Sequence, residues 1–144
     1  MQSVQKTVDF DSVADQLFGL VIDDQKTMRS IVRQMLHNIG ITEVEEYSEG
    51  ASAWNYLTAC TKDVPDFIVC DLHMEGMDGL EFVNKIRRSK IEHIHDIPVL
   101  ILTGDPDHFI QDVAAQVGAA KVLQKPISAP DMRMEIATIL GLQP

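Results

Sequence analysis

The stretch FIVCDLHMEGMDG, from Phe67 to Gly79, joins a run of apolar residues directly to an aspartate and then to turn-forming residues. A short apolar run bounded by turn signals is typical of a buried strand. Such a strand, ending next to Asp71, places one carboxylate at the edge of a sheet. Gly76 and the pair Asp78-Gly79 predict a sharp turn into the element that follows.

The same alternation of short apolar runs and amphipathic stretches occupies the chain from Leu17 onward. We predict strands at 17–22, 41–47, 65–70, 97–102 and 121–124. We predict helices at 28–39, 49–60, 78–89 and 106–117, and a last one from Ser128 or Asp131 to about Leu140. Parallel strands need crossover connections, so this order predicts a doubly wound α/β domain with five helices around a five-stranded parallel sheet.

Composition sets limits on the class of protein. The chain has 144 residues, enough for one domain, which we place at 17–142. Residues 1–16 are expected to be a flexible extension, although Val4, Val8 and Phe10 would allow a short docking helix. The formal net charge of −10 makes nucleic acid an unexpected partner. With neither a long apolar run nor a signal peptide pattern, we expect no membrane association and a cytoplasmic location.

Polar and charged residues follow four of the predicted strands. They are Asp23 and Asp24 after the first strand, Asp71 after the third, Thr103 after the fourth and Lys125 after the fifth. In a doubly wound sheet, ligands bind at the carboxyl ends of the strands, so these side chains are expected to converge. Each alone has an ordinary structural explanation, such as a helix cap or a solvated lysine. Together, three carboxylates favour a hard divalent cation, and Mg²⁺ fits because it also shares phosphate oxygens.

This combination suggests phosphoryl transfer to an aspartate. One carboxylate would act as the nucleophile, while the metal and the lysine stabilise charge on the phosphoryl oxygens. Thr103 would donate a hydrogen bond to the new phosphoryl group, and Gly104 has no side chain to crowd it.

The sequence resembles a response-regulator receiver domain over about residues 17–142. The resemblance is carried by the acidic pair, the D-x-x-M-x-x-M-D-G turn, the L-T-G and the K-P, in that order, each at the end of a predicted strand. VIDDQKTMRSIVRQML and TEVEEYSEGASAWNYL are especially similar to the CheY-like, single-domain chemotaxis members. The resemblance implies a flavodoxin-like sheet with strand order 2-1-3-4-5.

The resemblance also implies site roles and partners. Asp71 would accept a phosphoryl group from a phosphohistidine on a sensor histidine kinase or a histidine phosphotransfer protein. Asp24, Asp71 and the backbone carbonyl of His73 would bind Mg²⁺ directly, and Asp23 would bind it through water. Thr103 and Lys125 would contact the phosphoryl oxygens, and Pro126 would follow a cis peptide bond.

The chain departs from the family pattern at positions that bear on output. Glu75 stands where a proline is usual, and Val122 stands where an aromatic residue commonly couples to the threonine. Valine cannot perform that coupling, so a flagellar motor target is not expected. His73 and Asp105 lie two residues beyond Asp71 and Thr103, where they are expected to tune phosphorylation or hydrolysis.

Several functions remain open at this level. The first is a single-domain, self-phosphorylating and self-dephosphorylating switch that signals to an unknown target by protein contact and is not a metabolic enzyme. The second is a phosphorelay intermediate or phosphate sink, and the third is an interaction module independent of phosphorylation. A small phosphatase is the weakest alternative, because no second acid follows Asp71 at D-x-D spacing.

Overall fold

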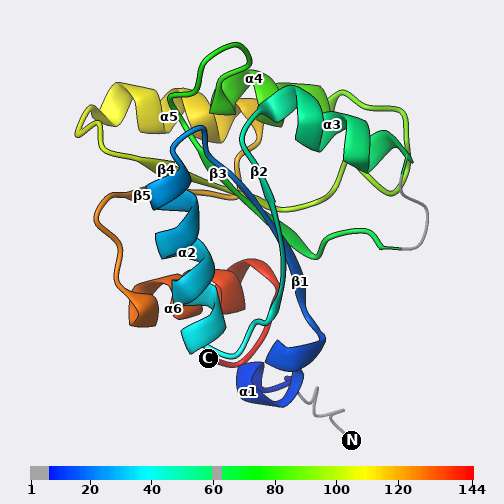
Figure 1. The fold of residues 1–144 in the computed structure, drawn as a ribbon, viewed down its shortest axis with the longest axis vertical. Coiled ribbons are helices and arrows are strands. Elements are labelled where there is room, and N and C mark those ends of the chain that lie inside the picture. The colour runs from blue at the N-terminus through cyan, green and yellow to red at the C-terminus, as the bar shows by residue number, and fades with distance from the viewer. Residues whose placement is uncertain (1–6, 60–62) are drawn as a thin grey trace, which may run out of the picture.

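A computed structural model describes residues 7–59 and 63–144 (Figure 1). Five strands form one parallel sheet in the order β2-β1-β3-β4-β5, which confirms the predicted fold class and strand order. The strands are β1 (Phe18–Ile22), β2 (Glu43–Tyr47), β3 (Phe67–Asp71), β4 (Val99–Thr103) and β5 (Lys121–Gln124). The helices that follow them are α2 (Lys26–Asn38), α3 (Gly50–Ala59), α4 (Gly79–Arg87), α5 (His108–Val117) and α6 (Ala129–Ile139).

Helices cover both faces of the sheet, as a doubly wound fold requires. On one face, Val32 and Leu36 of α2 join Met132 and Ile136 of α6 in one buried cluster with residues of the sheet. On the other face, a second cluster contains Leu57 of α3 and residues of α4, with α5 packed against it. Strands β3 and β4 are buried at every position, because each lies inside the sheet and is covered on both sides. In the described ranges, no helix is both long and apolar enough to cross a bilayer.

Element boundaries differ from the predicted ones for identifiable reasons. β3 and β4 each continue one residue further than predicted, because Asp71 and Thr103 still pair in the parallel ladder. α5 begins at His108 and not at Pro106, because Asp107 caps it by accepting a hydrogen bond from the Phe109 N–H. Ser128, one of the two predicted starts, caps α6 through the Asp131 N–H. The predicted helix end at Cys60 lies outside the described residues.

The described part of the segment before β1 is structured and holds a short helix that begins at Phe10, as one of the two expectations for this segment allowed. A short helix α1 (Phe10–Val13) and a 3-10 turn η1 (Ala14–Gln16) raise the number of α-helices in the described part of the chain from the expected five to six. The side chain of Phe10 is fully buried in the cluster beneath α2 and α6. The Phe10 N–H donates to the carbonyl of Gln143, which ties this segment to the other end of the chain. Val4 lies outside the described residues.

Candidate functional site

The parallel sheet brings four strand ends to one edge of the domain. Asp23 follows β1, Asp71 ends β3, Thr103 ends β4 and Lys125 follows β5. The ladder keeps these ends level, since Ile22 pairs with Cys70, Asp71 with Leu102, and Thr103 with Gln124. The topology therefore places residues that are far apart in the sequence around one site.

Three carboxylates meet at this edge. Oxygen atoms of Asp23, Asp24 and Asp71 all lie within 4.8 Å of one another. Asp23 is 2% exposed and Asp71 is 8% exposed, whereas Asp24 faces solvent. The site therefore has a buried floor with two acids and an open side with a third.

Lys125 supplies the positive charge nearest to these acids. Its Nζ donates a hydrogen bond to Asp71 Oδ1 at 2.7 Å and lies 3.8 Å from Asp23 Oδ2. Its backbone N–H donates to the carbonyl of Thr103 at 2.7 Å, and the Lys125-Pro126 peptide is cis, as the resemblance implied. One ammonium group faces three carboxylates, so the cluster remains anionic without a further cation.

Burial raises the pKa of Asp23 above its ordinary value. The Gln25 N–H, which donates to Asp23 Oδ1 at 2.9 Å, and the charge of Lys125 act in the opposite direction. The negative charges of Asp71 and Asp24 raise the pKa further. A cation bound between the three acids would relieve this repulsion.

Arg29 holds the backbone of Asp23 in place, a role that the sequence did not reveal. Its Nη1 donates to the Asp23 carbonyl at 2.7 Å, and its Nε lies 3.7 Å from Glu46 Oε1 on β2. The contact joins residues six positions apart, from the end of a strand to the first turn of a helix. No sequence motif marks such a pair, because it depends on where α2 begins.

The loop after β3 closes against the site and explains the stretch from Phe67 to Gly79. The N–H of Glu75 donates to Asp24 Oδ2 at 3.2 Å, so this loop contacts the exposed acid. The N–H of Gly79 donates to the Leu72 carbonyl at 2.9 Å. A Cβ on Gly79 would lie 2.7 Å from the Asp71 carbonyl oxygen, so only glycine allows α4 to start this close to β3.

Thr103 is fully buried, and its Oγ1 accepts a hydrogen bond from the Asp105 N–H at 3.0 Å. His73 is exposed, and its Nε2 lies 3.9 Å from Asp105 Oδ2. The two residues predicted to tune the site are thus brought together at its mouth. Val122 is half-buried and packs against the cluster on the α3 and α4 face.

The donor set fits Mg²⁺. Carboxylate oxygens are the ligands that this ion prefers, and an ion held by one or two of them keeps water in its remaining positions. The solvent-facing position of Asp24 leaves the site open to water on one side.

The sequence pattern of a known protein family, the response regulator receiver domain, matches residues 20–137 of the chain. The chain belongs to this family. It is a family of signalling proteins of two-component systems, which implies a kinase partner. The match thus accounts for most of the chain, including all of β2, β3, β4 and β5 and the last three residues of β1.

Two curated relatives show the range of proteins that carry this receiver domain. Chemotaxis protein CheY-3 of Vibrio cholerae is 32% identical over 120 residues, which cover 83% of this chain and 88% of that protein. The cyclic di-GMP phosphodiesterase response regulator RpfG of Xanthomonas campestris is 31% identical over 124 residues, or 86% of this chain. The match spans only 32% of the length of RpfG.

A solved structure agrees with the fold. Chemotaxis protein CheY4 of Vibrio cholerae is similar with a TM-score of 0.75 and 27% identity. The similarity covers 86% of this chain and 98% of that one.

Proposed function

We propose that Asp71 accepts a phosphoryl group from a phosphohistidine on a sensor histidine kinase or a histidine phosphotransfer protein. The observation that carries this proposal is the contact of 2.7 Å between Lys125 Nζ and Asp71 Oδ1, beside two further carboxylates. A solitary buried carboxylate would need only a charge partner. A lysine together with a surplus of acids is the arrangement expected where a phosphoryl group and a cation bind together.

Asp24 and Asp71 would hold Mg²⁺ directly, with the backbone carbonyl of His73, and Asp23 would act through water. When bound, Mg²⁺ neutralises charge on the phosphoryl oxygens. The two buried acids and the exposed one supply ligands of the required kind.

The remaining chemistry belongs to the side chains of this chain. Asp71 Oδ1 is engaged by Lys125, so Oδ2 attacks the phosphorus. The new O–P bond forms as the P–N bond breaks, and the electron pair leaves on the imidazole nitrogen of the donor. Lys125 then pairs with a phosphoryl oxygen, and the hydroxyl of Thr103 donates to another. Hydrolysis of the acyl phosphate restores Asp71.

Output occurs by contact with a downstream protein that prefers one state of the phosphorylated surface. His73, Glu75 and Asp105 lie at the mouth of the site and set the rates of phosphorylation and hydrolysis.

Val122 favours a second candidate function, a phosphorelay intermediate or phosphate sink. Such a protein passes its phosphoryl group to another histidine or to water and needs no aromatic switch at this position.

The proposal is tested by incubating the protein with acetyl phosphate and measuring its intact mass with Mg²⁺ and with EDTA. We expect the addition of one phosphoryl group with Mg²⁺ only, and none in Asp71→Asn. Asp112→Asn is the matched control, because Asp112 is an exposed aspartate on α5, and it should be modified like the wild type. Absence of modification at every Mg²⁺ concentration would leave a phosphorylation-independent interaction module. Adding a histidine phosphotransfer protein to the phosphorylated form and measuring back-transfer separates the relay from the switch.

A further inference from the structure

Strand β2 forms an open edge of the sheet. Among the described residues it pairs with β1 alone, because the strand order places it at the end of the sheet. The N–H of Asp23 donates to the carbonyl of Tyr47, so the backbone of Tyr47 points toward β1. Polar backbone groups alternate between the two sides of a strand, and the N–H and C=O of Val44 and Glu46 therefore point to the open side. Unpaired groups of this kind are a template for another strand.

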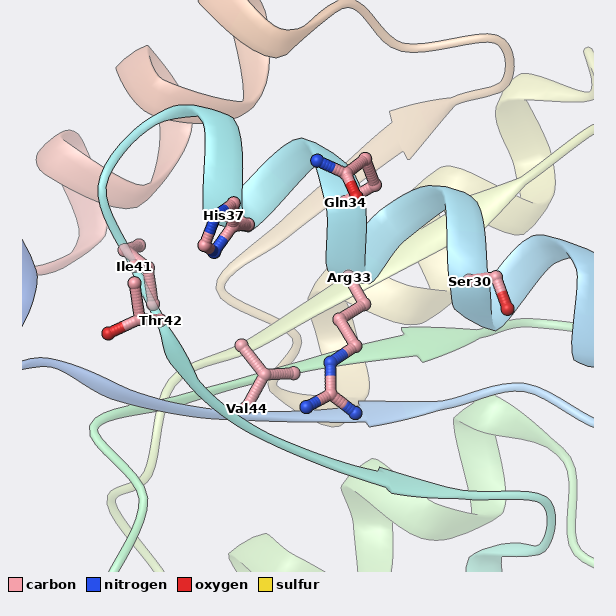
Figure 2. Close-up of a pocket in the computed structure, with 7 residues that line it drawn as sticks. All are labelled: Ser30, Arg33, Gln34, His37, Ile41, Thr42 and Val44. Carbon is pink, nitrogen blue, oxygen red and sulfur yellow. The ribbon is translucent and has the colours of Figure 1, made fainter.

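A hollow of about 480 Å³ lies beside this edge on the face covered by α2. Figure 2 shows Arg33 extending from α2 across to β2, next to Val44. Ile41 and Val44, both buried, give the hollow an apolar floor, and His37 of α2 also lines it. Arg33 is half exposed and is paired with Glu46 at 2.7 Å, so its charge is largely compensated. The other lining residues, Ser30, Gln34 and Thr42, are polar, so a small apolar side chain fits here over the floor of Ile41 and Val44.

A second hollow of about 330 Å³ lies beside the same strand on the opposite face. It is lined by three carboxylates, Glu43, Glu45 and Asp63, and by the rings of Phe18 and Tyr56. All three acidic residues are exposed. Carboxylates beside aromatic rings suit a guanidinium or ammonium group, which gains both ion pairing and cation–π attraction. The side chains of Glu43 and Glu45 face this hollow, while Val44 faces the other.

The charges of β2 decide which strand can join it. β2 carries three glutamates in five residues, so a second copy of β2 would bring like charges together. A strand with basic residues would instead be attracted to these glutamates. Successive side chains of a strand point to opposite faces, so its basic side chains would enter the acidic hollow and its apolar side chains would enter the other hollow.

We propose that the open edge of β2 binds an extended segment of a partner protein in which basic and small apolar residues alternate. The segment adds a sixth strand to the sheet and pairs with the backbone of Val44 and Glu46. Its basic side chains enter the hollow with Glu43 and Glu45, and its apolar side chains enter the hollow over Ile41. This surface is distinct from the phosphoryl site, so the proposal does not depend on phosphorylation of Asp71.

The test uses a short fluorescent peptide that alternates arginine and valine, with binding measured by anisotropy and by amide NMR. We expect saturable binding, with shifted and exchange-protected amide signals at Val44 and Glu46. A peptide that alternates glutamate and valine should bind at least about tenfold more weakly, since it reverses the charge. Two further peptides carry N-methyl groups, one on every valine and one on every arginine. Only one set of N–H groups faces β2, so one of these peptides should lose about tenfold or more in affinity and the other should not.

Variants of the protein separate strand addition from general attraction to an acidic protein. Glu43→Lys/Glu45→Lys should weaken binding by about tenfold or more. Asp112→Lys/Glu92→Lys makes the same change in net charge at exposed positions away from β2, and should bind within about twofold of the wild type. Thermal unfolding of each variant shows whether it is folded.

Three outcomes would overturn the proposal. The first is equal weakening by the two charge variants, which would show long-range attraction alone. The second is equal affinity of the two N-methylated peptides, which would show that the backbone of the peptide does not pair. The third is concentration-dependent protection of Val44 and Glu46 without peptide, which would show that a second copy of the chain occupies the edge.

Discussion

At the scale of single residues, the site is a balance between buried acids and one lysine. Asp71 and Asp23 are almost completely buried, and Lys125 contacts the first and lies near the second. A buried carboxylate is costly in a protein interior unless it is paired with a positive charge. Two substitutions therefore test the electrostatics directly.

Lys125→Ala should slow the phosphorylation of Asp71 by about a hundredfold, because it removes a donor aimed at charge that develops on the phosphoryl group. The measurement is the initial rate of modification by acetyl phosphate at fixed Mg²⁺. Lys121→Ala is the matched control, since Lys121 is an exposed lysine on β5, the strand that Lys125 follows, and should leave the rate unchanged. Equal rates in both variants would exclude a role of Lys125 in the reaction.

Asp23→Asn should stabilise the metal-free protein at neutral pH by about 1 kcal/mol, because it removes a buried negative charge beside two others. The pKa of Asp23 is raised in the folded state, so the folded protein binds more protons than the unfolded one between the two pKa values. The wild type therefore loses stability as pH rises through the folded pKa of Asp23, and the variant does not.

The measurement is urea denaturation in EDTA across this pH range, where the difference between the two proteins should shrink as the solution becomes more acidic. Mg²⁺ should stabilise the wild type more than the variant, since the variant lacks one acid of the site. A variant that is less stable than the wild type at neutral pH would show that the carboxylate of Asp23 is favourable in the folded protein.

At the scale of elements, the start of α4 packs closely against the end of β3. A Cβ at Gly79 would lie 2.7 Å from the Asp71 carbonyl oxygen and 3.0 Å from Leu72 Cα, and neither backbone atom can move freely. Gly79→Ala should therefore cost about 1–3 kcal/mol of unfolding free energy. Gly104→Ala is the control, because nothing lies within 4 Å of its added Cβ, and it should change stability by less than about 0.5 kcal/mol. Chemical denaturation of the two variants measures the difference, and equal stabilities would show that α4 can shift away from β3.

The elements also show what sequence reasoning could reach. The positions of Asp71 and Thr103 follow from apolar runs that end at polar residues, and the topology then brings the two strand ends together. The start of α5 was predicted at Pro106 and lies two residues later, at His108. In the structure, Asp105 Oδ1 accepts from the Asp107 N–H and Asp107 caps the helix. The contact of Arg29 with the Asp23 carbonyl had no signal, since it requires the exact start of α2.

At the scale of the whole molecule, the segment before β1 is part of the folded unit. Arg133 of α6 pairs with Asp11 at 2.6 Å and lies over the ring of Phe10, with 4.9 Å between the guanidinium carbon and the ring centre. Phe10 and Gln143 are neighbours in space at opposite ends of the chain. The sequence suggested a flexible extension by default, and Phe10 was one of three apolar residues that would allow a short docking helix. The partner of such a helix could not be predicted, because it lies at the far end of the chain.

Phe10→Ala should lower the unfolding free energy by about 3–5 kcal/mol, because it leaves a cavity in the cluster beneath α2 and α6. Phe109→Ala is the matched control, since the Phe109 side chain is 70% exposed and its loss should cost less than about 0.5 kcal/mol. Urea denaturation of both variants gives the comparison. A cost for Phe10→Ala as small as that of the control would mean that the first helix contributes nothing to the fold in solution.

The most direct test of the site is to locate the phosphoryl group within the chain. The protein is phosphorylated with acetyl phosphate and Mg²⁺, the acyl phosphate is reduced with borohydride to homoserine, and peptides are sequenced by mass spectrometry. We predict homoserine at position 71 and at no other aspartate, with Asp23 and Asp24 unchanged. Homoserine at either of these two residues, or on an exposed aspartate such as Asp112, would contradict the assignment of Asp71 as the acceptor.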